Sequence, residues 1–210
     1  MVLPQHGGPL MDAAGWDERY RAADTVWGVA PNRWVEQETG PLPPGVALDL
    51  ACGEGRNAIW LAGRGWRVHA VDFSPVAVEK GAELERRTLG ESRIEWVEAD
   101  ATSYNSPEPV DLAVLCYLQL PAAERRAAVR QAASALASGG VLLVIGHDSR
   151  NLTDGTGGPQ DPAVLFTAAD VATDLAGAGV TIERADEVLR PVEGADRPAI
   201  DALLRAVKVP

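Results

Sequence analysis

Three aspartates stand where apolar stretches of strand length end, at Asp49, Asp72 and Asp100. After the first of them, Gly53 and Gly55 form a glycine-rich turn, which lets a ligand approach the backbone closely. An acid at Asp49 favours a cationic ligand such as an amine or a sulfonium, because it would repel a phosphate. Asp72 can accept hydrogen bonds from two ribose hydroxyls, and Asp100 from the exocyclic amine of a purine. The combination indicates a binding site, although a single acid at a strand end is often only a cap.

His147 also follows an apolar stretch, and Asp148 comes directly after it. The pKa of an ordinary histidine lies near neutrality, so this side chain is suited to removing the proton of a hydroxyl acceptor. His147 is therefore the predicted catalytic base. The alternative, that it only hydrogen-bonds a loop backbone, agrees equally well with the sequence. His69, inside a predicted strand, and His6, near the N-terminus, are weaker candidates.

A long polar segment, residues 148–166, follows His147. Structureless loops of this length inside a compact domain are usually lids or binding loops. We expect this one to contact a polar acceptor, such as a sugar or another polyol; the alternative is a flexible excursion without contacts. The predicted acceptor contacts are Tyr117, Gln119, Asp148, Asn151, Asp154 and Gln160. The spacing of Asp148, Asp154 and Asp161 leaves magnesium open but fixes no metal site.

The elements that must position these residues are read from the hydrophobic pattern. Strands are expected at 46–51, 66–73, 93–100, 110–117, 140–147, 180–189 and 197–209. Segments of helical period separate the first five, and the last two follow each other directly. This order predicts an α/β fold with an open, mostly parallel sheet, helices on both faces and a C-terminal antiparallel hairpin. In such a sheet, ligands bind at the carboxyl ends of the strands.

Three of the helices have readable ends. They are bounded by Ser74-Pro75 and Gly90, by Pro121 and Gly139-Gly140, and by a capping box of Thr167 with Asp170. Serine before proline is a typical helix start, and glycine a typical helix stop. The helix between Pro121 and Gly139 is expected to include Leu136 on its apolar face. In the helix between Ser74 and Gly90, Gly81 lowers the helix propensity.

Composition excludes several classes of protein. The 210 residues are 46% hydrophobic and 23% charged, as in an ordinary globular domain. A formal net charge of -11 would repel nucleic acid, and no apolar stretch is long enough to cross a membrane. Cys52 and Cys116 lie in or beside apolar stretches and fit reduced thiols. We therefore expect a cytoplasmic protein whose partner is a small molecule.

The chain is expected to hold one domain, residues 12–210, after a flexible tail at 1–11. Residues 12–45 are predicted to form a helical cap, and residues 46–210 the sheet core. Within the cap, Trp16 is expected to pack in the core, whereas Tyr20 and Trp27 are expected to close over the ligand. The two C-terminal strands leave open a homodimer through the edge of the sheet.

The segment LDLACGEGRNAIWLAGRGWRVHAVDFSPVAV resembles the first two motifs of class I S-adenosylmethionine-dependent methyltransferases, and EADA resembles their adenine-side motif. WDERYRAADTVWGVAPN is similar to the small-molecule branch related to tellurite-resistance and thiopurine methyltransferases. The resemblance covers about residues 12–208 and implies a Rossmann-like, seven-stranded sheet. It also implies S-adenosylmethionine as the cofactor.

The resemblance also implies a role for each matching residue. The methionine part would be held by Asp49, Ala51, Gly53 and Gly55, the ribose by Asp72, and the adenine by Phe73, Asp100 and Ala101. Cys116 would close the pocket. Ala51 departs from the family, which more often has glycine in this stretch, and so leaves less room beside the methionine.

These observations predict a methyltransferase acting on a small polar molecule, with O-methylation by His147 as the leading mechanism. The tellurite and thiopurine resemblance favours instead a soft sulfur or chalcogen acceptor, which needs no base. Two further alternatives are a nicotinamide-dependent oxidoreductase, which Asp49 disfavours, and a non-catalytic S-adenosylmethionine-binding protein.

Overall fold

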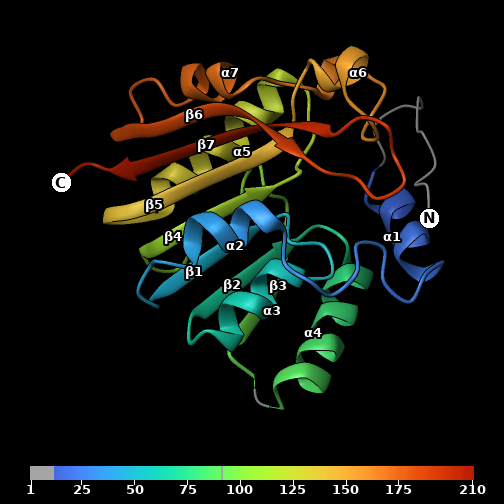
Figure 1. Ribbon diagram of the computed structural model, residues 1–210. Coiled ribbons are helices and arrows are strands. Elements are labelled where there is room, and N and C mark those ends of the chain that lie inside the picture. The colour runs from blue at the N-terminus through green and yellow to red at the C-terminus, as the bar shows by residue number, and fades with distance from the viewer. Residues whose placement is uncertain (1–11, 91) are drawn as a thin grey trace.

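A computed structural model describes residues 12–90 and 92–210 and contains one seven-stranded sheet (Figure 1). The strand order is β3-β2-β1-β4-β5-β7-β6. The pairs from β3 to β5 are parallel, and β7 runs antiparallel to both β5 and β6. The strands are β1 Val46–Leu50, β2 Arg67–Asp72, β3 Ile94–Glu98, β4 Val110–Cys116, β5 Leu136–His147, β6 Val180–Arg190 and β7 Ala199–Lys208. The expected α/β sheet with a C-terminal antiparallel hairpin is confirmed.

Helices cover both faces of this sheet. They are α1 Ala13–Arg21, α2 Arg33–Thr39, α3 Arg56–Gly63, α4 Pro75–Leu89, α5 Ala122–Ala135, α6 Asn151–Asp154 and α7 Ala168–Asp174, with a 3-10 turn at Pro162–Val164. Side chains of α2 and α3 share one apolar core with the sheet, and those of α5 and α7 share the other. Burial on both faces explains why the central strands are almost continuously apolar.

Most helix ends follow the local sequence signals. The Ser74 hydroxyl accepts a hydrogen bond from the amide of Ala77, and Gly90 ends α4 with a φ of 73°. Thr167 and Asp170 form the expected capping box at the start of α7. The predicted stop at Gly139-Gly140 is wrong. Helix α5 ends at Ala135, and Leu136 already begins β5, because Val110 of β4 pairs with it.

A tryptophan explains the two glycines at 55 and 81. A Cβ atom on Gly55 would lie 2.2 Å from the ring of Trp96, and one on Gly81 would lie 2.3 Å from it. The indole of Trp96 donates a hydrogen bond to Glu85 at 2.9 Å. Gly81 therefore lets α4 approach β3 closely, which outweighs its low helix propensity.

Two expectations about organisation have different outcomes. The segment 148–166 is not a structureless loop, because it contains α6 and the 3-10 turn. The predicted tail at 1–11 lies outside the described residues. In the described part of the chain, no helix is both long and apolar enough to cross a membrane.

Candidate active site

The glycine-rich turn connects β1 to α3 through three residues with positive φ. Ala51, Gly53 and Gly55 have φ angles of 63°, 57° and 74°. Glycine adopts such angles freely, whereas alanine is strained there by roughly 1 kcal/mol. Ala51 thus has the backbone conformation of a glycine. Strain of this kind persists only where the surrounding structure imposes it.

Asp49 lies at the end of β1 with a carboxylate that is 1% exposed. Neither of its oxygens has a hydrogen-bond partner in the part of the chain that the structure describes. Burial raises the pKa of Asp49 to about 7, against the opposing effects of the Ala58 amide and Arg56. A buried carboxylate without a partner is costly, so its presence indicates that a cationic ligand completes the site.

Asp72 ends β2 and accepts two backbone hydrogen bonds, from Gly53 at 2.8 Å and from Ser74 at 3.0 Å. Burial raises its pKa, and these amides lower it in part. The amide of Gly53 is therefore engaged by Asp72. Asp72 instead ties the turn to the second strand, which fixes the position of both acids.

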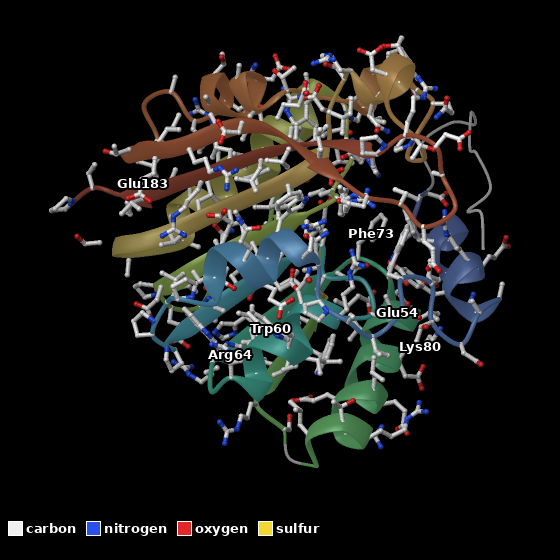
Figure 2. All side chains as sticks on the ribbon, in the orientation of Figure 1. Glu54, Trp60, Arg64, Phe73, Lys80 and Glu183 are labelled. Atoms are coloured by element: carbon white, nitrogen blue, oxygen red, sulfur yellow. The ribbon has the colours of Figure 1, made fainter. Side chains whose placement is uncertain are left out.

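The residues expected around the adenine lie at the same edge of the sheet. Phe73 is 38% exposed, and Figure 2 shows it on the side of the molecule that carries α1. Asp100 is exposed and accepts hydrogen bonds from the amide and hydroxyl of Thr102. Ala101 is buried in the core beneath it. Phe73 is the large apolar side chain here that is free to stack on a ligand.

The N-terminal segment covers the glycine-rich turn. The Tyr20 hydroxyl lies 2.8 Å from where a Cβ atom on Gly53 would be, and Trp27 lies at 3.8 Å. Trp16 stacks on Tyr20 with ring centroids 5.5 Å apart. Tyr20 is 4% exposed, and its burial raises its pKa. The structure thus brings Tyr20 and Trp27 against the predicted cofactor turn, with Trp16 packed behind them.

Two charged side chains, Lys80 and Glu54, hold this segment in place. Lys80 of α4 donates to the carbonyls of Tyr20 and Ala23, each at 2.7 Å, and pairs with Glu54 at 2.7 Å. Glu54 in turn accepts a hydrogen bond from the amide of Val26. Glu54 and Lys80 lie side by side beneath α1 in Figure 2. We call this pair, Lys80 and Glu54, the latch.

A second group of side chains gathers at the ends of β4, β5, β6 and β7. Asp201 is fully buried, and its Oδ2 accepts hydrogen bonds from Tyr117 at 2.8 Å and Arg190 at 2.8 Å. The indole of Trp34 donates to the same oxygen at 3.1 Å. Tyr117 has a positive φ of 61°, a strained backbone for a bulky residue. We call these four residues the Asp201 cluster.

His147 completes this region. Its Nδ1 lies 3.4 Å from Asp201 Oδ1, and its ring packs on Tyr117 with centroids 4.8 Å apart. The side chain is 14% exposed. Burial lowers the pKa of His147 to about 4, more than the charge of Asp201 raises it. The imidazole is therefore neutral at physiological pH and able to accept a proton.

Cys116 links the two regions. It lies half-buried at the end of β4, and desolvation raises the pKa of its thiol to about 12, with the charges of Asp49 and Asp201 adding to the increase. A thiol with such a pKa stays protonated and unreactive. Because the charges of Asp49 and Asp201 both act on this thiol, we place the Asp201 cluster and Asp49 at the same edge of the sheet.

Most of the predicted acceptor contacts make internal hydrogen bonds instead. Gln119 accepts from the amide of His147 and donates to the carbonyl of Val164. Asn151 bonds to Ile200 and Gly157, and Asp148 to the amide of Arg150. Asp154 pairs with Arg150 at the surface, and Gln160 contacts neighbouring loop carbonyls. These residues shape segment 148–166. The Tyr117 hydroxyl also bonds internally, to Asp201, while its ring packs on that of His147.

Sequence reasoning missed Asp201, Arg190 and Trp34. The available signal was Asp201 itself, a single acid inside the apolar stretch AIDALLRAV. No group of three or more potential metal ligands exists among the described residues, so magnesium gains no site here.

Comparisons with known proteins agree with this geometry. Residues 47–140 match the methyltransferase domain family. Demethylmenaquinone methyltransferase of Clavibacter sepedonicus is 42% identical over 79 residues, which are 38% of this chain and 29% of that protein. Probable thiol methyltransferase 2 of Arabidopsis thaliana is 27% identical over 103 residues, 48% of this chain and 46% of that protein.

A solved structure described for the conversion of a disulfide bond into a thioacetal group during echinomycin biosynthesis shares the fold. Its TM-score is 0.74 at 21% identity, with 94% of this chain and 92% of that chain covered. The chain spans less than half the length of the two curated relatives.

The match over residues 47–140 identifies this part of the chain as a methyltransferase domain of the S-adenosylmethionine-dependent class. The main evidence that S-adenosylmethionine fits this site is the carboxylate of Asp49, which is buried without a hydrogen-bond partner in the described chain. A positively charged group of the cofactor would pair with this carboxylate at the end of β1. No corresponding feature favours the pyrophosphate of a nicotinamide cofactor there.

Proposed function

We propose that this protein transfers a methyl group from S-adenosylmethionine to a hydroxyl of a small polar molecule, with His147 as the base. When bound, the cofactor supplies a methyl group on a positively charged sulfur. The observation that carries the proposal is the buried carboxylate of Asp49, which has no hydrogen-bond partner within the described chain. His147, which packs against Tyr117 of the Asp201 cluster, supplies a neutral imidazole.

Each of the chain's residues has a definable task in this proposal. Asp49 and the turn from Ala51 to Gly55 hold the positively charged methionine part. Asp72 binds the ribose, while Phe73, Asp100 and Ala101 border the adenine, and Cys116 closes the floor between the two ligands. Tyr20 and Trp27 cover the cofactor and exclude water. The main contribution to rate is alignment of the acceptor atom with the methyl carbon.

The acceptor site is proposed at the Asp201 cluster and His147. Neutral His147 can take the hydroxyl proton as the oxygen attacks. Tyr117 is the first acceptor contact in this proposal; Gln119, Asp148, Asn151, Asp154 and Gln160 act by shaping the wall formed by segment 148–166. A net charge of -11 supports a small acceptor rather than nucleic acid.

A thiol or chalcogen acceptor is the second candidate, and two observations favour it. The pKa of His147 is lowered to about 4, which makes it a weak base for an ordinary hydroxyl. The Arabidopsis relative is named a thiol methyltransferase. A soft nucleophile needs no base, so His147 would then act only by contact.

The two candidates are separated by His147→Gln, which keeps a polar side chain but cannot act as a base. Formation of S-adenosylhomocysteine is measured with catechol, glucose and 2-mercaptoethanol. O-methylation predicts catechol or glucose turnover that falls about 100-fold in the variant. Turnover of the thiol alone, unchanged in the variant, would reject the hydroxyl proposal. Tight cofactor binding without turnover of any acceptor would indicate a non-catalytic binding protein.

A further inference from the structure

Asp201 and His147 face each other across two antiparallel strands. They are direct partners in the register between β5 and β7, so their side chains project from the same face of the sheet. Asp201 is fully buried, while His147 keeps a small exposed area. The Nδ1 atom of His147 is buried and forms no hydrogen bond within the described chain.

The two oxygens of Asp201 are unequally satisfied. Oδ2 accepts hydrogen bonds from Trp34, Tyr117 and Arg190 at 2.8 to 3.1 Å. Within the described chain, Oδ1 has two polar contacts, with Arg190 Nη2 and His147 Nδ1, each at 3.4 Å. Oδ1 therefore keeps capacity for one closer donor, and the N–H of an imidazole is the group nearest to it.

We infer that Asp201 is a positioning residue, which binds the Nδ1–H of His147 and so keeps Nε2 unprotonated and directed toward the acceptor. This inference rests on the proposed function, in which His147 is the base. A carboxylate beside one ring nitrogen fixes the tautomer by accepting its proton. The contact at 3.4 Å is long in the free protein and is expected to shorten when a ligand binds.

The proton and electron balance of the step is complete. The acceptor O–H proton moves to Nε2, the oxygen electron pair forms the bond to the methyl carbon, and the sulfur keeps the pair of the broken C–S bond. The resulting imidazolium is then stabilised by the Asp201 charge. Arg190 opposes that charge, and it donates to both oxygens of the carboxylate, to Oδ2 at 2.8 Å and to Oδ1 at 3.4 Å.

The cluster also connects the base to the N-terminal cap. Trp34 belongs to α2, and its hydrogen bond to Asp201 spans 167 positions of the chain. Tyr117 holds the same oxygen from a strained backbone at the end of β4. Three separate elements thus fix one carboxylate, which is more than packing a single buried acid would require.

The test is nitrogen NMR of the folded protein labelled with 15N-histidine. The sequence has three histidines, so His147→Gln and His69→Gln assign the signals. We expect a pyrrole-like Nδ1 and a pyridine-like Nε2 for His147 in the wild type without ligand. In Asp201→Asn we expect loss of that preference and a fall in kcat of about 100-fold, with cofactor Kd changed less than threefold.

Tyr117→Phe is the matched control, because it removes one donor from Oδ2 and leaves Oδ1 facing His147. Tyr117→Phe should retain the wild-type tautomer of His147. If Asp201→Asn does not fold, the nitrogen NMR spectrum of the wild type alone tests the inference, through which ring nitrogen of His147 carries the proton. A wild-type His147 with its proton on Nε2 would overturn the inference, as would an unchanged tautomer in Asp201→Asn. Turnover that is unchanged in His147→Gln would show instead that His147 is not the base, which is a failure of the proposed function rather than of this inference.

Discussion

At the scale of single residues, the carboxylate of Asp49 is expected to trade stability for cofactor binding. Its folded pKa of about 7 lies above the value in an unfolded chain, so the ionised form destabilises the free protein. Asp49→Asn should therefore raise the free energy of unfolding at pH 8 by about 2 kcal/mol and weaken S-adenosylmethionine binding at least tenfold. Urea unfolding and calorimetry measure the two effects.

The stabilisation has a defined pH window. Because the folded pKa is raised, the favourable contribution of protonated Asp49 is complete below pH about 4 and is lost as pH rises toward 7. The advantage of Asn over Asp should accordingly shrink at pH 5. A variant that is less stable than the wild type at pH 8 would contradict the account of Asp49.

Cofactor affinity should also depend on pH through the same carboxyl group. A cation binds the ionised form, so below pH 7 the Kd for S-adenosylmethionine should rise up to about tenfold per pH unit. Calorimetry between pH 5.5 and 7 checks the slope. Asp49→Asn is the control, since its Kd should be nearly flat over this range; a flat wild-type Kd would show that Asp49 does not titrate on binding.

The sequence predicts the positions of Asp49 and Asp72 well and gives little indication of the contacts of Asp201. Asp49 and Asp72 end predictable strands beside glycines, so local pattern places them at one edge. Asp201 depends on partners from three other elements, and no local spacing encodes these contacts. Likewise, the polar residues of 148–166 are recognisable as polar but not as internally bonded.

At the scale of elements, the contact between α4 and β3 depends on Gly81, which has no side chain. Alanine normally stabilises a helix relative to glycine by about 1 kcal/mol, but a Cβ at position 81 would lie 2.3 Å from Trp96. Gly81→Ala should therefore destabilise the protein by about 1–3 kcal/mol in urea unfolding.

A matched substitution separates packing from helix propensity. Gly63 lies in α3, where an added Cβ would meet Leu89 at an ordinary 3.4 Å. Gly63→Ala should be tolerated or slightly stabilising. If Gly81→Ala proved as stable as Gly63→Ala, the close packing of Trp96 on α4 would be refuted.

Element types and order are predictable because burial on both faces leaves strong apolar runs. The boundary between α5 and β5 is not predictable in the same way. Leu136 fits the helical period, and Gly139-Gly140 is a typical stop, yet pairing with β4 draws Leu136 into the strand. Tertiary pairing here overrides the local signals.

At the scale of the whole molecule, the latch is expected to hold the N-terminal cap over the cofactor. Lys80→Met removes three polar contacts and leaves Glu54 buried without its cation. We expect faster hydrogen exchange in α1 and a Kd for S-adenosylmethionine raised about fivefold or more.

Lys208→Met is the control for that prediction. Its ammonium also bonds two backbone carbonyls, of Ala133 and Ala178, but these belong to the α5 and α7 side of the sheet. It should leave exchange in α1 unchanged. Equal exchange in α1 of the Lys80→Met variant and the wild type would contradict the role of the latch.

The central claim is tested most directly by calorimetry of the wild type with S-adenosylmethionine and, separately, NADH. The account predicts binding of S-adenosylmethionine, no binding of NADH, and a loss of roughly 1–3 kcal/mol of binding free energy in Asp72→Ala. Folded protein that binds no S-adenosylmethionine, or that binds it equally well without the Asp72 carboxylate, would contradict the assignment of this site.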